Sequence, residues 1–203
     1  MKRVWEEGDA ILRRSIEPGE FQGRDYVRKA IARGRTPFLD LRIIGQSDGS
    51  GTILHNATEC ENLAVALTGD SRGTILLPRY LKMMELVLAA VGRAEEQMIL
   101  SSTFVIDGNT VFYHRKSDSV RFAYAPCPKE EKTSGRILLT LWEWTGEIDP
   151  EFGIKWPFLG EMFTELMRES AGRFSCMEAI RQLQREFPRE RTMRGRFGME
   201  DND

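Results

Sequence analysis

The sequence lacks most of the residue patterns from which catalytic and metal sites are built. It holds only two histidines, His55 and His114, and three widely spaced cysteines, Cys60, Cys127 and Cys176. The cysteines form no CxxC pair, so neither a disulfide framework nor a zinc site is expected, and all three are interpreted as small buried thiols. The HExxH pattern of zinc proteases is missing too. No nucleophile and acid are evident as partners of either histidine, so both are interpreted as surface or strand-end side chains rather than members of a hydrolytic triad.

Long hydrophobic runs are also missing. The longest apolar stretches, such as 86–91, are far shorter than the about 20 residues that a membrane-spanning helix needs. Residues 1–7 lack the apolar core of a signal peptide, so a cytoplasmic location is expected. A formal net charge of −2 argues against bulk binding of nucleic acid, which needs clustered positive charge. A chain of 203 residues with 41% hydrophobic and 30% charged residues fits one globular domain or two small lobes.

The first third of the chain predicts a small β-rich unit. Residues 1–24 are polar and are expected to form an extended arm or a marginal first strand. Apolar runs at 38–44 and 52–56 flank a loop rich in Gly, Asp and Ser, which predicts an antiparallel hairpin. The loop lacks the lysine and the following helix of a phosphate-binding loop. Thr58 and Glu61 have capping-box spacing and predict a short helix that stops near residue 69.

The remainder predicts helices around a second group of strands. A wide apolar face predicts a buried helix over 79–97, followed by short strands at 104–106, 110–113 and 120–124. Apolar spacing predicts further helices over 134–145 and 158–169, joined by a connection bracketed by Asp149-Pro150 and Trp156-Pro157. A second capping box, Ser175 to Glu178, predicts the start of a last helix that ends before Pro188. The charged tail, 188–203, is expected to be disordered.

A long helix followed by tight hairpins and a loop is the order in which a kinase-like C-lobe builds its catalytic centre. Aligning 109–112 with the Asn-Ile-Leu-Leu segment of that pattern places Phe104 at the catalytic base. Tyr124-Ala125-Pro126 then replaces the Asp-Phe-Gly segment that holds magnesium. Without the two carboxylates, phosphoryl transfer is not expected. Asp107 and Asn109 remain candidates for holding a nucleotide, although Asp107-Gly108-Asn109 is explained equally well as a plain turn.

The segment from about 31 to 187 resembles DUF6382, a bacterial family of unknown function often found ahead of a forkhead-associated domain. The matching pieces are the hairpin that ends at 53–58, the helix over 79–97, the strands at 104–106 and 120–126, and the helical segment at 174–180. This family pattern is similar in turn to the degenerate kinase-like cytosolic domains of type VII secretion membrane proteins. The resemblance implies a pseudokinase-like fold. No forkhead-associated domain follows in this sequence, so the phosphothreonine-reading role of such a domain is not expected here.

These observations predict an α+β protein with a degenerate kinase-like fold. An N-terminal arm, 1–24, would precede a single domain, 25–187, with a small antiparallel β lobe at about 25–77 and a mostly helical lobe at about 78–187 that contains a β-hairpin. The expected function is a non-catalytic interaction or scaffold domain in bacterial signalling or secretion, with an unidentified protein partner and no cofactor or metal. Trp144 and Trp156 are possible interface anchors.

Two alternatives stay open. The first is a divergent phosphotransferase that depends on ATP and magnesium and uses Asp107, Asn109 or Asp118 in place of the usual acids. The second is a protein associated with nucleic acid or a membrane surface through the arginines of 185–196.

Overall fold

The computed structural model describes residues 11–17, 25–34, 36–45, 50–69, 73–127 and 133–188. These residues form two small antiparallel sheets and several helices, which confirms the expected α+β class. The tail after 188, for which disorder is expected, lies outside the described residues, as do the glycine-rich loop 46–49 and the charged loop 128–132.

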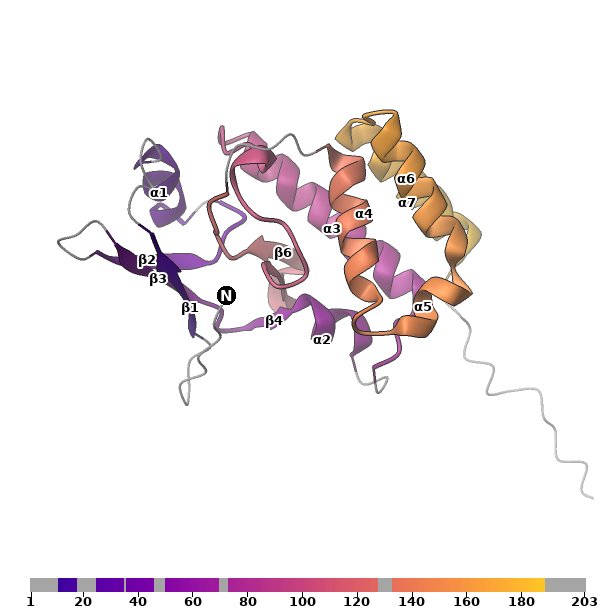
Figure 1. The fold of residues 1–203 in the computed structure, drawn as a ribbon, viewed down its shortest axis with the longest axis horizontal. Helices are drawn as coiled ribbons and strands as arrows, with labels where there is room; N and C mark the ends of the chain where they lie inside the picture. The colour runs from indigo at the N-terminus through magenta and orange to yellow at the C-terminus, as the bar shows by residue number, and fades with distance from the viewer. Residues whose placement is uncertain are drawn as a thin grey trace, which may run out of the picture.

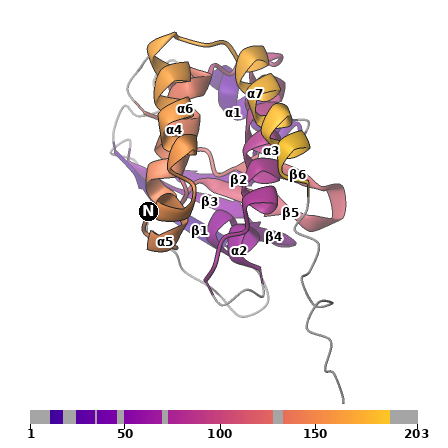
Figure 2. The ribbon, with the colours of Figure 1, turned by 90° about the vertical axis from the view of Figure 1, so that its right-hand side faces the viewer.

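The first sheet contains β1 (Ile11–Ile16), β2 (Asp40–Gly45) and β3 (Gly51–Asn56), in the order β1-β3-β2. The predicted hairpin is confirmed as β2 and β3, paired from Asp40 with Asn56 to Gly45 with Gly51. Part of the N-terminal arm forms a strand, since β1 pairs with β3 and lies before the expected domain start at 25. Helix α1 (Asp25–Ala32) lies over this sheet in both views (Figures 1 and 2).

The second sheet contains β4 (Cys60–Asn62), β5 (Val111–His114) and β6 (Ser119–Phe122). Its first strand corrects the helix predicted from Thr58, because residues 60–62 pair with β5 instead of forming a first helical turn. Helix α2 (Leu63–Thr68) begins later, where the Asn62 side chain accepts a hydrogen bond from Val65 N at 2.9 Å. The sheet therefore takes strands from both sides of the lobe boundary expected near 77.

The prediction of a strand over 104–106 is wrong. Ser101–Thr103 form a 3-10 turn, η1, and Phe104 makes only an isolated antiparallel bridge to Pro126. Val105 N donates to Ala125 O at 2.8 Å, so this segment runs beside the chain that follows β6. The two sheets meet close by, since Leu39 N donates to Phe122 O at 2.9 Å and Phe122 N donates to Pro37 O at 2.8 Å.

Helices make up the opposite end of the molecule, at the right of Figure 1. They are α3 (Leu77–Glu95), α4 (Ser134–Thr145), α5 (Pro150–Lys155), α6 (Pro157–Arg168) and α7 (Arg173–Glu186). The predicted helices α3, α4 and α6 are confirmed. The expected connection between 149 and 157 is instead a short helix capped by Asp149, and the last helix begins at Arg173, so Ser175 is not its N-cap.

Two helix pairs dominate the packing: α4 lies against α6, and α3 lies against α7 (Figure 2). A Cβ at Gly135 would overlap the backbone of Leu166 and Met167, so this glycine lets α4 and α6 approach closely. One large apolar cluster runs from α1 through α3 to α7, and a smaller one lies between the sheets. Within the described ranges, no helix is both long and apolar enough to cross a membrane.

Candidate functional site

The position aligned with a kinase catalytic centre is filled by aromatic side chains. Phe104 and Tyr124 are both 0% exposed, and their ring centroids lie 6.3 Å apart. Phe38, which comes from the segment before β2, contacts both rings, at 4.9 Å from Phe104 and 5.6 Å from Tyr124. Phe122 lies 5.4 Å from Phe104. The two residues that replace the expected acids therefore belong to the core that joins the sheets to the helices.

Asp107 and Asn109 lie in a turn that leads into β5. Asp107 Oδ1 accepts hydrogen bonds from Asn109 N at 2.8 Å and from Thr110 N at 3.0 Å. The Thr110 hydroxyl donates to the backbone of this segment and accepts from Asp107 N at 2.9 Å. One oxygen of the Asp107 carboxylate thus holds the backbone in the plain turn that was one interpretation of Asp107-Gly108-Asn109. The Asn109 side chain is exposed.

The two tryptophans expected as interface anchors are both partly buried against their own chain. The Trp144 ring of α4 covers Gly108, where a Cβ would overlap the indole. Trp156 packs edge-on against Phe158 and Phe187, with centroid distances of 6.1 and 5.7 Å. Both rings therefore contribute to internal packing in the structure.

Asp118 follows the other end of β5, so the structure does not bring it together with Asp107. Its backbone is left-handed, with φ 44°, and its carboxylate accepts a hydrogen bond from Tyr113 Oη at 2.9 Å. Lys82 Nζ lies 2.9 Å from the second carboxylate oxygen. The Lys82 hydrogen bond, followed by that of Tyr113, lowers the pKa of Asp118. Asp118 also lines an open groove of about 610 Å³ between α3 and the end of α7.

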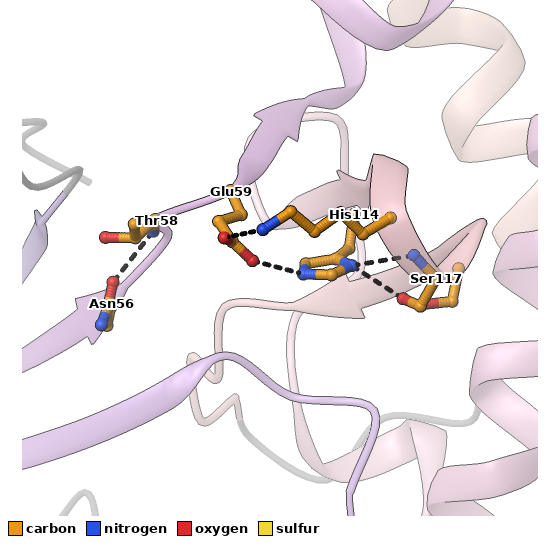
Figure 3. A network of polar contacts seen from close by, with 7 residues as sticks. Asn56, Thr58, Glu59, His114 and Ser117 are labelled. Atoms are coloured by element: carbon orange, nitrogen blue, oxygen red, sulfur yellow. Dashed lines mark hydrogen bonds and ion pairs between the residues drawn. The ribbon is translucent and has the colours of Figure 1, made fainter.

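A polar network joins the turn before β4 to the turn after β5 (Figure 3). Ser117 Oγ lies 2.7 Å from His114 Nδ1, and His114 Nε2 lies 3.4 Å from Glu59 Oε2. Lys116 also pairs with Glu59, and this hydrogen bond is the main cause that lowers the pKa of the Glu59 carboxyl. The expectation that His114 has no acid and no nucleophile as partners is therefore wrong.

Sequence reasoning missed Glu59 and Ser117. Ser117 could have been found, because a side chain at one end of a tight turn can reach a residue three positions later. Glu59 had no local signal. It reaches His114 only because β4 pairs with β5, which sets Cys60 opposite His114.

His55 lies next to the end of β3, the middle strand of the first sheet, and is buried, so the strand-end interpretation is confirmed and the surface one is wrong. Its Nε2 lies 3.0 Å from Tyr124 O, so it donates to this carbonyl, and Nδ1 has no hydrogen-bond partner among the described residues. Burial lowers the pKa of His55 to about 4, the Tyr124 hydrogen bond raises it, and the Arg14 charge lowers it further. The ring is a neutral link between the first sheet and the segment after β6.

The three cysteines lie far apart in the fold and form no disulfide. All three are free thiols; Cys176 is buried, whereas Cys60 and Cys127 are only half-buried, which corrects their expected burial. The described ranges contain no group of three His, Cys, Asp or Glu side chains that could hold a metal ion.

Comparisons with known proteins found no matching family model and no matching curated protein. The resemblance to DUF6382 and to kinase-like domains remains a prediction from the sequence.

Proposed function

We propose that this chain is a non-catalytic protein-interaction domain with a degenerate kinase-like architecture. The observation that carries the proposal is the burial of Phe104 and Tyr124, both 0% exposed, at the positions aligned with the catalytic base and the metal-binding acid. Phosphoryl transfer depends on metal ions and positioned charges around the phosphates. Packed aromatic rings supply neither.

The order of elements supports the kinase-like part of the proposal. Helix α3 directly precedes the segment that leads to the β5–β6 hairpin, and a small antiparallel sheet lies ahead of it in the chain. The segment 103–105 runs antiparallel to 125–127, which keeps the loop positions of a catalytic centre next to each other. The resemblance to a bacterial family linked with signalling domains suggests a role in bacterial signalling or secretion.

Exposed apolar side chains support a role in binding a protein. Ile154 and Phe174 are 80% exposed, and Met98 is 73% exposed. Large apolar side chains on a surface are favoured contacts in protein interfaces. We expect such residues, rather than the partly buried rings of Trp144 and Trp156, to make the first contact with a partner.

The phosphotransferase alternative has less support. Asp107 holds a turn, and Asp118 pairs with Lys82 at the far end of β5. The alternative based on C-terminal arginines rests mostly on residues outside the described ranges. Arg185 is described, and it pairs with Glu178 at 3.0 Å.

A phosphotransfer assay tests the proposal. The full chain is incubated with ATP labelled at the γ-phosphate, with magnesium or manganese, and both self-labelling and phosphate release are followed. The expected result is no transfer above a blank without protein. Metal-dependent transfer that disappears in Asp107→Asn but persists in the matched variant Asp118→Asn would overturn the proposal and favour the phosphotransferase.

A further inference from the structure

The hydrogen positions in the Glu59–His114–Ser117 network follow from a single backbone contact. Ser117 N donates to His114 Nδ1 at 3.2 Å. A main-chain amide can only donate, so Nδ1 carries a lone pair. A neutral imidazole then carries its proton on Nε2, which faces Glu59 Oε2 at 3.4 Å. The structure therefore assigns the tautomer of His114.

This tautomer fixes the direction of the remaining bonds. Ser117 Oγ lies 2.7 Å from Nδ1, and because Nδ1 accepts, the hydroxyl donates its one proton to the ring. Ser119 Oγ, 2.7 Å from Ser117 Oγ, must then donate to it. The hydroxyls of Ser119 and Ser117, the imidazole and the carboxylate form one directed chain that ends at Glu59; Figure 3 shows its part from Ser117 to Glu59. Such chains polarise the groups within them.

The network exceeds what a turn cap needs. Capping the 3-10 turn Arg115–Ser117, η2, requires only the amide of Ser117 and the Nδ1 lone pair. The serine hydroxyl at 2.7 Å and the carboxylate behind Nε2 are additional. Together they match the arrangement of a nucleophile, its base and a group that orients the base.

Burial and backbone geometry suit these roles. The His114 side chain is 12% exposed, so the ring is held in place, whereas Ser117 is exposed and accessible to a reagent. Glu59 has a left-handed backbone with φ 67°, and Lys116 also holds its carboxylate. Ser117 is not among the residues that line the groove near Asp118.

We propose that Ser117 is an activated nucleophile that accepts an acyl group from an activated ester, with His114 as its general base and Glu59 as a positioning residue. Ser117 Oγ attacks the acyl carbon and its proton passes to the Nδ1 lone pair of His114, which no longer accepts the hydrogen bond from Ser117 N while it is protonated. The bond between the acyl carbon and the leaving oxygen then breaks, and the proton on Nδ1 leaves with that oxygen. The product is an ester on Ser117 and a free alcohol or phenol, with no change of oxidation state. The step ends at the ester on Ser117 and includes no turnover, so it is a modification of the chain and is independent of the proposed non-catalytic interaction function.

The test uses p-nitrophenyl acetate with the full-length protein, followed by intact mass and peptide mapping. Ser175 is also exposed and serves as an internal reference in every sample. We expect acetylation of Ser117 to exceed that of Ser175, and His114→Gln to lower the Ser117 rate by roughly 100-fold or more, the usual range for a general base. Ser117→Ala should remove the main adduct, whereas Ser175→Ala should not.

Glu59→Gln separates a positioning role from a merely structural one. It keeps the ring and its cap, so we expect the melting temperature to change little while the ratio of Ser117 to Ser175 labelling falls. Equal labelling of the two serines in the unmodified protein, acetylation of lysines alone, or an unchanged ratio in His114→Gln would each overturn the proposal. Because the ratio of Ser117 to Ser175 acetylation is measured within one protein sample, a modest loss of stability would not by itself produce the expected fall in this ratio.

Discussion

His55 Nε2 lies 3.0 Å from the carbonyl oxygen of Tyr124, 69 residues later in the chain. This bond joins the centre of the first sheet to the residue that stands where a kinase-like centre would place its metal-binding acid. The histidine is buried with one ring nitrogen lacking a hydrogen-bond partner among the described residues, so it fits the structure only as a neutral ring.

The first prediction concerns acid stability. The pKa of His55 is about 4 in the folded chain and near 6.5 when unfolded, so the unfolded state binds more protons between these values. The stability due to this group should be complete above pH 6.5 and should fall as the pH drops, by about 3 kcal/mol at pH 4. His55→Gln keeps a donor near Tyr124 O without titrating. The free energy of unfolding, measured by urea unfolding at several pH values between 4 and 7, should fall less steeply with decreasing pH in this variant than in the unmodified protein. An equal pH dependence in the two proteins would contradict this explanation.

The second prediction concerns Tyr80, whose hydroxyl is buried and has no hydrogen-bond partner among the described residues. Burial raises the pKa of this phenol well above its ordinary value. Removing an unpaired buried hydroxyl relieves its desolvation cost, so Tyr80→Phe should raise the free energy of unfolding by about 1 kcal/mol. Tyr113→Phe is the matched control. It removes a hydroxyl that donates to Asp118 at 2.9 Å and should lower stability slightly. A greater loss in Tyr80→Phe than in the control, measured by urea unfolding, would show that the hydroxyl is satisfied.

The third prediction concerns the end of α3, where Met98 N donates to Glu95 O at 2.9 Å and Ile99 N donates to Ala94 O at 3.0 Å. These two bonds define a Schellman motif, whose left-handed residue is usually glycine. Met98 occupies that position with φ 61° and is 73% exposed, so little packing depends on its side chain. Met98→Gly should stabilise the fold by about 0.5–1 kcal/mol in thermal unfolding. Glu96→Gly, at φ −56°, should instead destabilise it, and the same sign for both variants would refute this explanation.

The fourth prediction concerns Gly108, which lies under the Trp144 ring. Gly108→Ala should lower the free energy of unfolding by about 1–3 kcal/mol, because the new methyl group overlaps the indole. In a Trp144→Ala background the same change should cost much less. A double-mutant cycle by urea unfolding measures this coupling, and purely additive effects would mean that the ring does not press on the turn.

The apolar pattern predicted the long helices well, because the buried face of a helix is made of residues that lie close together in the sequence. The buried face of α3 is visible in residues spaced three and four apart, and α4 and α6 follow the same rule. Contacts between residues that are far apart in the chain produce no such pattern in the local sequence. The contacts from His55 to Tyr124 and from Glu59 to His114 arise only when strands from separate segments pair.

The errors came from local signals that tertiary pairing overrode. Thr58 and Glu61 have the spacing of a capping box, but pairing with β5 keeps Cys60–Asn62 extended and moves the cap to Asn62. The Ser175 capping box likewise falls inside α7, which begins two residues earlier at Arg173. At the candidate centre, the replacement of the acids by Phe104 and Tyr124 stays a prediction from the sequence. The sequence could not reveal that Phe38 packs against the rings of both Phe104 and Tyr124.

The most direct test of the central claim is a thermal-shift titration of the full chain with ATP, with and without magnesium. A ligand that binds only the folded state at 100 times its dissociation constant adds about 2.7 kcal/mol of stability. For a chain of this size, that corresponds to a rise in melting temperature of roughly 5–10 °C. Because Phe104 and Tyr124 fill the candidate site, the account predicts no shift up to millimolar nucleotide. A magnesium-dependent rise that is lost in Asp107→Asn would contradict it.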